Sequence, residues 1–377
     1  MNTATNLAAP VQADDDRYRV MVVDDSVVIR GLLARALESD PRIRVVASVG
    51  NGQLALSTLD RQDIEVVVLD IEMPVMDGMT ALPKLIAAKP NLQVIMASTL
   101  TLQNAGISMR AMAAGAVDYI PKPSSRELSG AKDFNRDLIE KVKAWGGAAR
   151  RARGLREPRG GAVVAKAPRP IAGAATAIRL RMASITRPDA VAIGSSTGGP
   201  QALAKLVAGI GAWMKLPVFI TQHMPPTFTT ILAEHLANAA GMPAAEGRNG
   251  EPVVGGRIYV APGSYHMTVV VEGGQKIIRL LTTPPENFCR PAVDPMLRSL
   301  VSVYGARLTV VMLTGMGQDG LKGSEAVIAG GGGLMAQDEA TSVVWGMPGA
   351  VAMAGLCSAV LPLAELAPRL KRIVLGI

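Results

Sequence analysis

Short apolar runs alternate with helix-like segments through residues 18–145, and this alternation constrains the fold more than any other feature. Runs such as VVVL and VIMA contain no polar residue, as do strands that are buried on both faces of a parallel sheet. The runs lie at Tyr18–Val23, Arg44–Ala47, Val66–Leu69, Val94–Ala97 and Tyr119–Ile120. The helix-like segments lie at Ser26–Glu38, Gly52–Leu59, Met79–Ala88, Ile107–Ala114 and Phe134–Trp145. We therefore predict a doubly wound α/β domain with a five-stranded parallel sheet.

The second half of the chain, residues 189–377, alternates in the same way but contains more glycine. Its apolar runs include Ala190–Ile193, Val218–Thr221, Ile258–Val260, Leu308–Leu313 and Leu334–Ala336. This pattern predicts a second α/β domain with a mostly parallel sheet. Ligand sites in such sheets lie at the carboxyl ends of the strands, so the residues after these runs are the candidates for chemistry.

A basic segment separates the two halves. Residues 146–187 contain ten of the Lys and Arg residues and one acid, so the rest of the chain sums to a charge of −1 although the whole carries +8. We predict a disordered tail at residues 1–17, a first domain at 18–145, a flexible basic linker at 146–188 and a second domain at 189–377. Because the positive charge belongs to the linker rather than to a folded face, we do not expect a nucleic-acid partner.

The chain has two cysteines, Cys289 and Cys357, whose spacing suits neither a metal site nor a disulfide framework. No apolar window approaches the ~18 residues that a membrane span needs. The start of the chain is polar and lacks the basic and apolar regions of a secretory signal. We therefore expect a cytoplasmic protein, monomeric and without membrane insertion.

Five polar residues follow the strands of the first domain and should meet at one edge of its sheet. Asp24 and Asp25 follow the first run, Asp70 the third, Ser98 the fourth and Lys122 the fifth. Three converging carboxylates repel one another unless a cation joins them, and an all-oxygen ligand set suits Mg²⁺. A carboxylate beside Mg²⁺ can attack a phosphoryl group, with the metal and the lysine neutralising the transferring oxygens.

The loop after Ala190–Ile193 reads GSSTGG, in which Gly194, Ser196 and Gly198 match the G-x-S-x-G pattern of a serine nucleophile on a strand-to-helix turn. The alternatives are a plain glycine-rich turn and a phosphate-binding loop. The second lacks the G-x-G-x-x-G and G-K-[ST] patterns that such loops carry.

A serine nucleophile needs a base, and the chain has three histidines. His235 lies in a helical pattern and His266 in a turn, whereas His223 follows a strand, as Ser196 does. Elimination favours His223. Asp319, Asp338 and Asp294 are all candidates for the carboxylate that orients the base, and the chemistry alone leaves the three open. Backbone N–H groups of the glycine-rich loop before Asp319, such as that of Met316, can stabilise an oxyanion.

The first domain resembles the receiver domain of response regulators, through the residues above and the run LDIEMPVMDG. The resemblance implies phosphorylation at Asp70 and a metal pair formed by Asp24 and Asp25. It also implies that Ser98 is the switch hydroxyl and that Lys122 is the conserved lysine of the family.

The second domain resembles the catalytic domain of chemotaxis protein-glutamate methylesterases. The matching runs are GSSTGG, QHMP, APG, RPAVD, MLTGMGQDG and AQDEATSVVWGMP. This resemblance implies a triad of Ser196, His223 and Asp319, with Thr197 and the Met316 amide on the oxyanion side and no metal in the esterase site.

Together the two resemblances imply an enzyme that hydrolyses glutamate methyl esters on methyl-accepting chemotaxis receptors and also deamidates receptor glutamines. They make a chemotaxis histidine kinase the phosphate donor, and phosphorylation of the receiver would relieve autoinhibition. Two alternatives keep the receiver domain: a DNA-binding transcriptional regulator, and a second domain that docks without catalysis. No helix-turn-helix pattern supports the first alternative.

Overall fold

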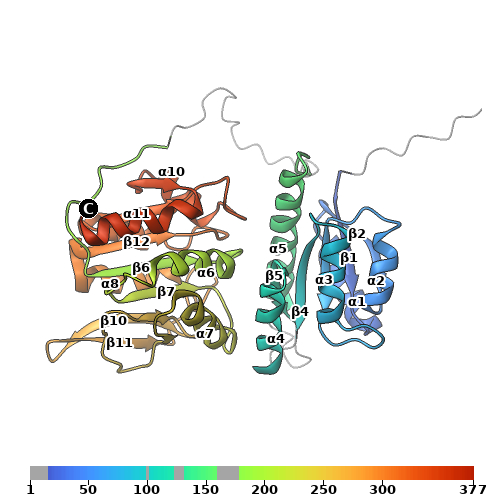
Figure 1. Cartoon of the computed structure of the whole chain (residues 1–377), viewed down its shortest axis with the longest axis horizontal. Coiled ribbons are helices and arrows are strands. Elements are labelled where there is room, and N and C mark those ends of the chain that lie inside the picture. The colour runs from blue at the N-terminus through green and yellow to red at the C-terminus, as the bar shows by residue number, and fades with distance from the viewer. Residues whose placement is uncertain (1–15, 99–101, 123–130, 159–177) are drawn as a thin grey trace, which may run out of the picture. The chain divides into compact units, whose positions relative to one another are not determined.

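The computed structural model describes residues 16–98, 102–122, 131–158 and 178–377. Strands and helices alternate along most of this part of the chain, as Figure 1 shows. Residues 1–15 of the predicted tail and residues 159–177 of the predicted linker lie outside the described residues. Among the helices that the structure describes, none has both the length and the apolar character to cross a bilayer.

The first sheet has five strands in the order β2-β1-β3-β4-β5, which confirms the predicted receiver-like architecture. Strand β1 pairs in parallel with both β2 and β3, and β4 pairs in parallel with β5. The strands are β1 (Tyr18–Val23), β2 (Ile43–Val49), β3 (Val66–Asp70), β4 (Gln93–Ser98) and β5 (Asp118–Pro121). The helices are α1 (Val27–Glu38), α2 (Gly52–Leu59), α3 (Gly78–Ala88), α4 (Leu102–Ala113) and α5 (Ala131–Ala152).

Helix ends in this domain follow from side-chain caps. Ser26 Oγ accepts a hydrogen bond from the Ile29 N–H at the start of α1, and Asp77 Oδ1 accepts one from Thr80 at the start of α3. Such caps satisfy backbone donors that have no partner within the helix. The predicted start of the first helix at Ser26 therefore falls on the cap residue, one position before the helix itself.

Helix α5 is longer than the sequence predicts. We expected it to end at Trp145 and a flexible linker to begin at Gly146, but the helix continues to Ala152. A Cβ at Gly146 would lie 2.7 Å from the Tyr18 ring, so glycine here permits close packing rather than chain flexibility. The prediction failed because a glycine-rich, basic pattern is typical of linkers, while this one is held by tertiary contacts.

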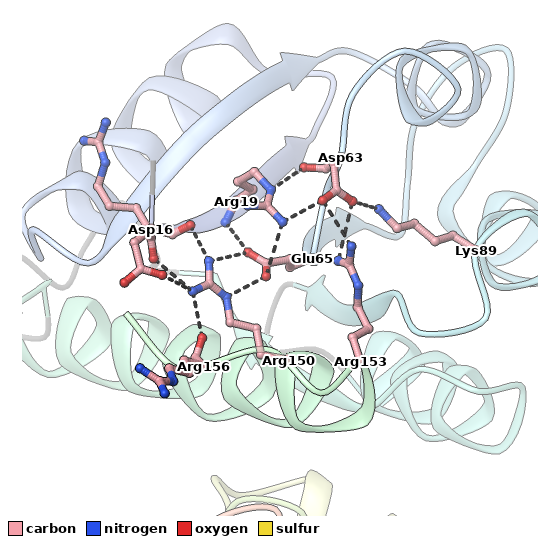
Figure 2. A network of polar contacts seen from close by, with 9 residues as sticks. Asp16, Arg19, Asp63, Glu65, Lys89, Arg150, Arg153 and Arg156 are labelled. Atoms are coloured by element: carbon pink, nitrogen blue, oxygen red, sulfur yellow. Dashed lines mark hydrogen bonds and ion pairs between the residues drawn. The ribbon is translucent and has the colours of Figure 1, made fainter. Parts of the chain in front are cut away.

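Arg150 provides those contacts. Its guanidinium is buried and binds the buried carboxylate of Glu65 on the strand side, with Nε 2.7 Å from Oε1. It also donates to the carbonyl oxygens of Asp16 and Arg17 and lies 5.1 Å from the centre of the Tyr18 ring. Figure 2 shows how this network joins the end of α5 to the start of the sheet. Arg150 and Arg151, two of the ten basic residues assigned to the linker, therefore lie in a helix of the folded domain, and Arg153 pairs with Asp63.

The last residues of the predicted linker are also bound. The Arg181 N–H donates to the Cys357 carbonyl oxygen, and the Arg187 guanidinium donates to the carbonyl oxygens of Val374 and Leu375. Residues 178–188 carry no regular secondary structure but are hydrogen-bonded to the second domain.

The second sheet has seven strands in the order β14-β13-β12-β6-β7-β9-β8, and all its pairs are parallel. Its strands are β6 (Ala190–Ser195), β7 (Val218–Gln222), β8 (Ala244–Glu246), β9 (Ile258–Val260), β12 (Leu308–Met312), β13 (Gly333–Gln337) and β14 (Ala359–Leu361). The helices are α6 (Gly199–Ile210), α7 (Phe228–Ala240), α8 (Val293–Tyr304), α9 (Leu321–Ala329), α10 (Met347–Met353) and α11 (Leu363–Leu375), with a 3₁₀ turn at Gly305–Arg307. The predicted mostly parallel sheet is confirmed.

The sequence did not predict the antiparallel hairpin of β10 (His266–Glu272) and β11 (Gln275–Leu281), which forms a separate two-stranded sheet. One face of β10 is apolar, and Met267 and Val269 lie in the same buried core as Phe219, Tyr259 and the helix α8 side chains. The hairpin therefore extends the core of the second domain beyond its main sheet.

Candidate active site and acidic pocket

Strand order in the second sheet brings three loops together. The chain proceeds from β6 to β7 on one side, whereas β12 lies on the other side of β6. The strand order therefore reverses beside β6, and ligands of open α/β sheets bind at such points. Ser196 follows β6, His223 follows β7, and the loop after β12 contains Asp319.

The nucleophile loop is fixed by backbone contacts. The Ser196 N–H donates to the Thr314 carbonyl oxygen, and the Ser196 carbonyl accepts from the Gly199 N–H at 2.7 Å. Gly198 has φ = 76°, where a side chain would be strained, and a Cβ there would lie 2.6 Å from Val343. The loop thus turns sharply from β6 into α6 and leaves Ser196 half-buried.

His223 lies beside the nucleophile loop because of strand register. Ser195 pairs with Gln222 across β6 and β7, so the residues that follow them leave the same edge of the sheet side by side. The His223 N–H donates to the Ser195 carbonyl oxygen. The imidazole Nε2 lies 2.7 Å from Asp319 Oδ2, and the side chain keeps 12% of its surface exposed.

The Asp319 carboxylate is almost fully buried and accepts hydrogen bonds on both oxygens. Oδ2 accepts from His223 Nε2, and the other donors are the backbone N–H groups of Val293, Asp294 and Gly320 and the side-chain amide of Asn287. A carboxylate with this many donors is held in one orientation and can hold the imidazole in one orientation in turn.

These contacts shift the pKa values of the pair in opposite directions. Burial opposes a charge on the His223 ring, but contacts with Cys289 and Asp319 outweigh it and raise the pKa of the imidazole. Burial also opposes ionisation of Asp319, but the hydrogen bonds from His223, Val293 and Asp294 outweigh it and lower the pKa of the carboxyl. The Asp319 carboxylate is therefore ionised beside an imidazole that holds its proton more strongly than a free histidine does.

The oxyanion candidates lie on the two loops that meet at Ser196. A Cβ at Gly315 would lie 2.9 Å from Ser196 Cβ, so glycine lets the loop that carries Met316 approach the nucleophile. Thr197 is buried, and its carbonyl oxygen accepts from Thr314 Oγ1 at 3.0 Å. The segment after β13 braces this loop, since Gly315 exchanges hydrogen bonds with Val344 and Met347.

The remaining histidines and acids have other surroundings. Both ring nitrogens of His266 are engaged by backbone groups of Ala292 and Pro284. His235 lies half-buried on α7. Asp338 Oδ1 accepts from the N–H and Oγ1 of Thr341 and so stabilises a turn. Of the three candidate acids, the structure pairs Asp319 with His223.

In the first domain, Val23 pairs with Leu69 across β1 and β3, so the acids that follow these strands are neighbours. Carboxylate oxygens of Asp24, Asp25 and Asp70 lie within 4.8 Å of one another. Asp24 and Asp70 are buried and Asp25 is exposed, which leaves one side of the cluster open. A cluster of oxygen ligands at this separation fits a hard divalent cation.

Ser98 and Lys122 lie at the ends of the next two strands. Ser98 is buried at the end of β4, with its hydroxyl 3.0 Å from that of Ser108. Ser98 also accepts a hydrogen bond from the Lys122 N–H at its carbonyl oxygen. A Cβ at Gly78 would lie 2.0 Å from the Asp70 carbonyl oxygen, so only glycine allows the loop after β3 to close over this strand end.

Comparison with known proteins assigns both halves of the chain. Residues 20–130 match the family model of the response regulator receiver domain, and residues 191–370 match that of the CheB methylesterase. The chain belongs to the family of CheB-type protein-glutamate methylesterases.

Two relatives match along almost the whole chain. The protein-glutamate methylesterase/protein-glutamine glutaminase of group 2 operon of Rhodospirillum centenum is 56% identical, over 98% of this chain and 97% of that protein. The protein-glutamate methylesterase/protein-glutamine glutaminase of Azospirillum brasilense is 57% identical, over 96% of this chain and 93% of that protein. The crystal structure of the Thermotoga maritima CheB methylesterase catalytic domain covers 50% of this chain and 100% of its own, with 36% identity and a TM-score of 0.49. Family membership favours the hydrolase over a DNA-binding regulator.

Sequence reasoning missed several residues that support this methylesterase site. Gln222 Nε2 donates to the carbonyl oxygens of Ser196 and His223, and its Oε1 accepts from the Ser195 hydroxyl at 2.7 Å. Gln337 Oε1 accepts from the Thr314 N–H on the opposite side of the loop. Both residues lie in runs that match the methylesterase domain, Gln222 in QHMP and Gln337 in AQDEATSVVWGMP, and these runs were a usable signal.

Proposed function

We propose that this chain hydrolyses glutamate methyl esters on chemotaxis receptors to glutamate and methanol, under the control of phosphorylation in its receiver domain. The observation that carries the proposal is the 2.7 Å contact between His223 Nε2 and the buried Asp319, at the strand edge from which the Ser196 loop also leaves. The printed names of the relatives, which describe methylesterases and glutaminases, support the substrate class.

In the proposed mechanism the Ser196 hydroxyl attacks the ester carbonyl carbon while His223 takes its proton. The imidazolium that forms is stabilised by Asp319, which stays ionised because several donors hold it. The tetrahedral intermediate carries an oxyanion, and we assign its stabilisation to Thr197 and to the backbone N–H of Met316.

The intermediate expels methanol as His223 returns the proton to the leaving oxygen. Water, activated by the same base, then attacks the acyl group on Ser196 and releases glutamate. An amide can follow the same route with ammonia as the leaving group, so deamidation of receptor glutamines uses the same residues. The residues of this site supply every proton transfer that the reaction requires.

The experiment is methanol release from methylated receptor membranes. We expect Ser196→Ala to lose the activity by at least about 10³-fold, because the acyl intermediate cannot form. Ser302→Ala is the matched control, since its hydroxyl only bonds the Arg298 carbonyl oxygen on α8. Methanol release by the Ser196 variant at the parent rate would refute the proposal, and the docking-module alternative predicts no release from either protein.

For regulation, we propose that Asp70 accepts a phosphoryl group from a chemotaxis histidine kinase. Asp24, Asp25 and Asp70 would hold Mg²⁺, which when bound neutralises charge on the transferring group. The Asp70 carboxylate forms an acyl phosphate, Lys122 adds a positive charge, and Ser98 exchanges its Ser108 partner for the new phosphate.

We expect phosphorylation to raise the esterase rate by relieving inhibition by the receiver domain. Asp70→Asn should keep the basal rate but lose the increase on addition of a small-molecule phosphodonor. Asp60→Asn makes the same change at an exposed residue after α2 and should respond as the parent does. A normal increase in the Asp70 variant would rule out this regulation.

A further inference from the structure

A second buried carboxylate lies beside Asp319 in the second domain. Asp294, in the first turn of α8, is almost fully buried, and its N–H donates to Asp319 Oδ1. Asn287 connects the two acids. Its Nδ2 lies 2.9 Å from Asp319 Oδ1 and 3.0 Å from Asp294 Oδ2.

The acids differ in how many donors they have. Asp319 accepts five hydrogen bonds, while Asp294 accepts from Asn287 and from the Gly323 N–H. Burial and the neighbouring Asp319 charge raise the pKa of Asp294, whereas the pKa of Asp319 is lowered. The two shifts therefore favour ionisation of Asp319, the acid that contacts His223, over ionisation of Asp294.

We propose that Asn287 is a positioning residue for ester hydrolysis: its amide donates to both buried carboxylates and holds Asp319 in the orientation that contacts His223. This inference rests on the proposed function, since it assigns a role through Asp319 and His223. Asn287 bonds Asp319 rather than the imidazole, so it acts on catalysis only through that carboxylate.

The amide is required for a chemical reason. An ionised carboxylate only accepts hydrogen bonds, so a group that bridges two of them must offer two donors, and the side-chain NH₂ group of asparagine does so without adding a charge. The backbone suits the residue as well. Asn287 has φ = 51°, a left-handed conformation that asparagine adopts more readily than most side chains. It lies within the turn that is closed by paired hydrogen bonds between Glu286 and Cys289.

Other charged groups face the pair. Arg298 on α8 lies near both acids and is paired with Glu286. On the imidazole side, Cys289 and Asp319 contact His223. Asn287→Asp keeps the shape and the backbone preference of the residue but replaces the two donors with a third acid. It should therefore misplace the Asp319 charge and raise the pKa of His223 further.

The test compares Asn287→Asp and Asn287→Gly with the parent chain in the methanol-release assay. We expect kcat to fall about 100-fold for Asn287→Asp and about 10-fold for Asn287→Gly, with KM within a factor of two. We also expect the acid limb of the kcat profile to move to higher pH in the Asp variant. Asn249→Asp is the matched control. Its Oδ1 only accepts from the Leu280 N–H, so the change keeps that bond and should leave kcat and the profile unaltered.

The two variants separate positioning from loop shape. If Asn287 only shaped the loop, both variants would keep the parent kcat and pH profile, because aspartate and glycine also adopt the left-handed conformation, and this result would overturn the proposal. If Asn287→Asp failed to fold in a thermal melt, the kcat of the folded Gly variant would decide, and an unchanged kcat would overturn it. An active Ser196→Ala variant would instead refute the proposed function, so the two failures are distinguishable.

Discussion

The two domains contain buried carboxylates that the protein treats in opposite ways. In the second domain, Asp319 is surrounded by five hydrogen-bond donors and contacts a histidine. In the first domain, Asp24, Asp25 and Asp70 gather within 4.8 Å of one another, with one of the three exposed. The first arrangement balances a charge inside the protein, and the second concentrates charge at an open edge.

The difference follows from the role that we propose for each site. A carboxylate that orients a base must keep one position and one charge throughout the reaction, and fixed N–H donors achieve this at no cost in reorganisation. A carboxylate that accepts a phosphoryl group must change its charge and its neighbours, so its balancing charge is best supplied by a cation from solution. A third buried carboxylate, Glu65, is balanced by Arg150 and serves structure.

The largest expected effect is that of a change at Asp319, the acid that accepts five hydrogen bonds. Asp319→Asn should lower kcat for methanol release by about 10⁴-fold, because the amide cannot stabilise the imidazolium and favours the wrong tautomer. Asp338→Asn removes a charge from a turn in the same domain and should change kcat less than threefold. Equal losses in the two variants would contradict the distinction between these acids.

The next prediction tests whether the cluster of Asp24, Asp25 and Asp70 needs a cation to accept phosphate. Removal of Mg²⁺ with a chelator should abolish acceptance of phosphate at Asp70 and leave the basal esterase rate unchanged. Radiolabel transfer from a small-molecule phosphodonor and methanol release, measured on the same sample, give the two readouts. Loss of the basal rate on chelation, reversed by Mg²⁺, would contradict the assignment of the cation to the receiver alone.

The third prediction concerns Glu65, the buried acid that pairs with Arg150: removal of the arginine should reduce stability. Arg150→Met should lower the free energy of unfolding of the receiver by about 3 kcal/mol, because the buried Glu65 carboxylate loses its nearest cation and is left with the 3.4 Å ion pair to Arg19. Arg151, the next residue on α5, is half exposed and pairs with Glu157, so Arg151→Met should cost less than about 1 kcal/mol. Denaturant melts of the two variants measure the difference, and similar midpoints would be evidence against a structural role for Arg150.

The smallest effect is on pH dependence. His223 must be neutral to accept the serine proton, and its pKa is raised, so kcat/KM should fall as the pH drops through a value above the ordinary ~6.5. The value of kcat/KM rises on the alkaline side because the imidazolium loses its proton there and becomes the neutral base. A rate profile between pH 5 and 10 checks this, and an acid limb centred below pH 6 would contradict the raised pKa.

Much of the architecture could be read from the sequence, because buried parallel strands leave a strong local pattern. Runs such as Val66–Leu69 and Leu308–Leu313 match β3 and β12 within one residue. Residues at strand ends can also be placed from the sequence, since parallel strands end at one edge of a sheet. This placed Asp24 and Asp70 together in the first domain, and Ser196 and His223 together in the second. The β10–β11 hairpin was missed because its pattern is only partly apolar.

What the sequence determined by itself is therefore the two parallel sheets, the acidic cluster and the placement of Ser196 and His223 at one sheet edge, because each depends on local periodicity and strand ends. Only the tertiary structure decided which acid meets His223, since side-chain chemistry alone does not distinguish Asp294, Asp319 and Asp338, and Asp319 is the one found in contact with the imidazole. It also decided the end of α5, because a buried partner for Arg150 lies 85 residues away. Contacts between residues distant in sequence leave no local signal, and Asn287 is bound to Asp319 by such a contact.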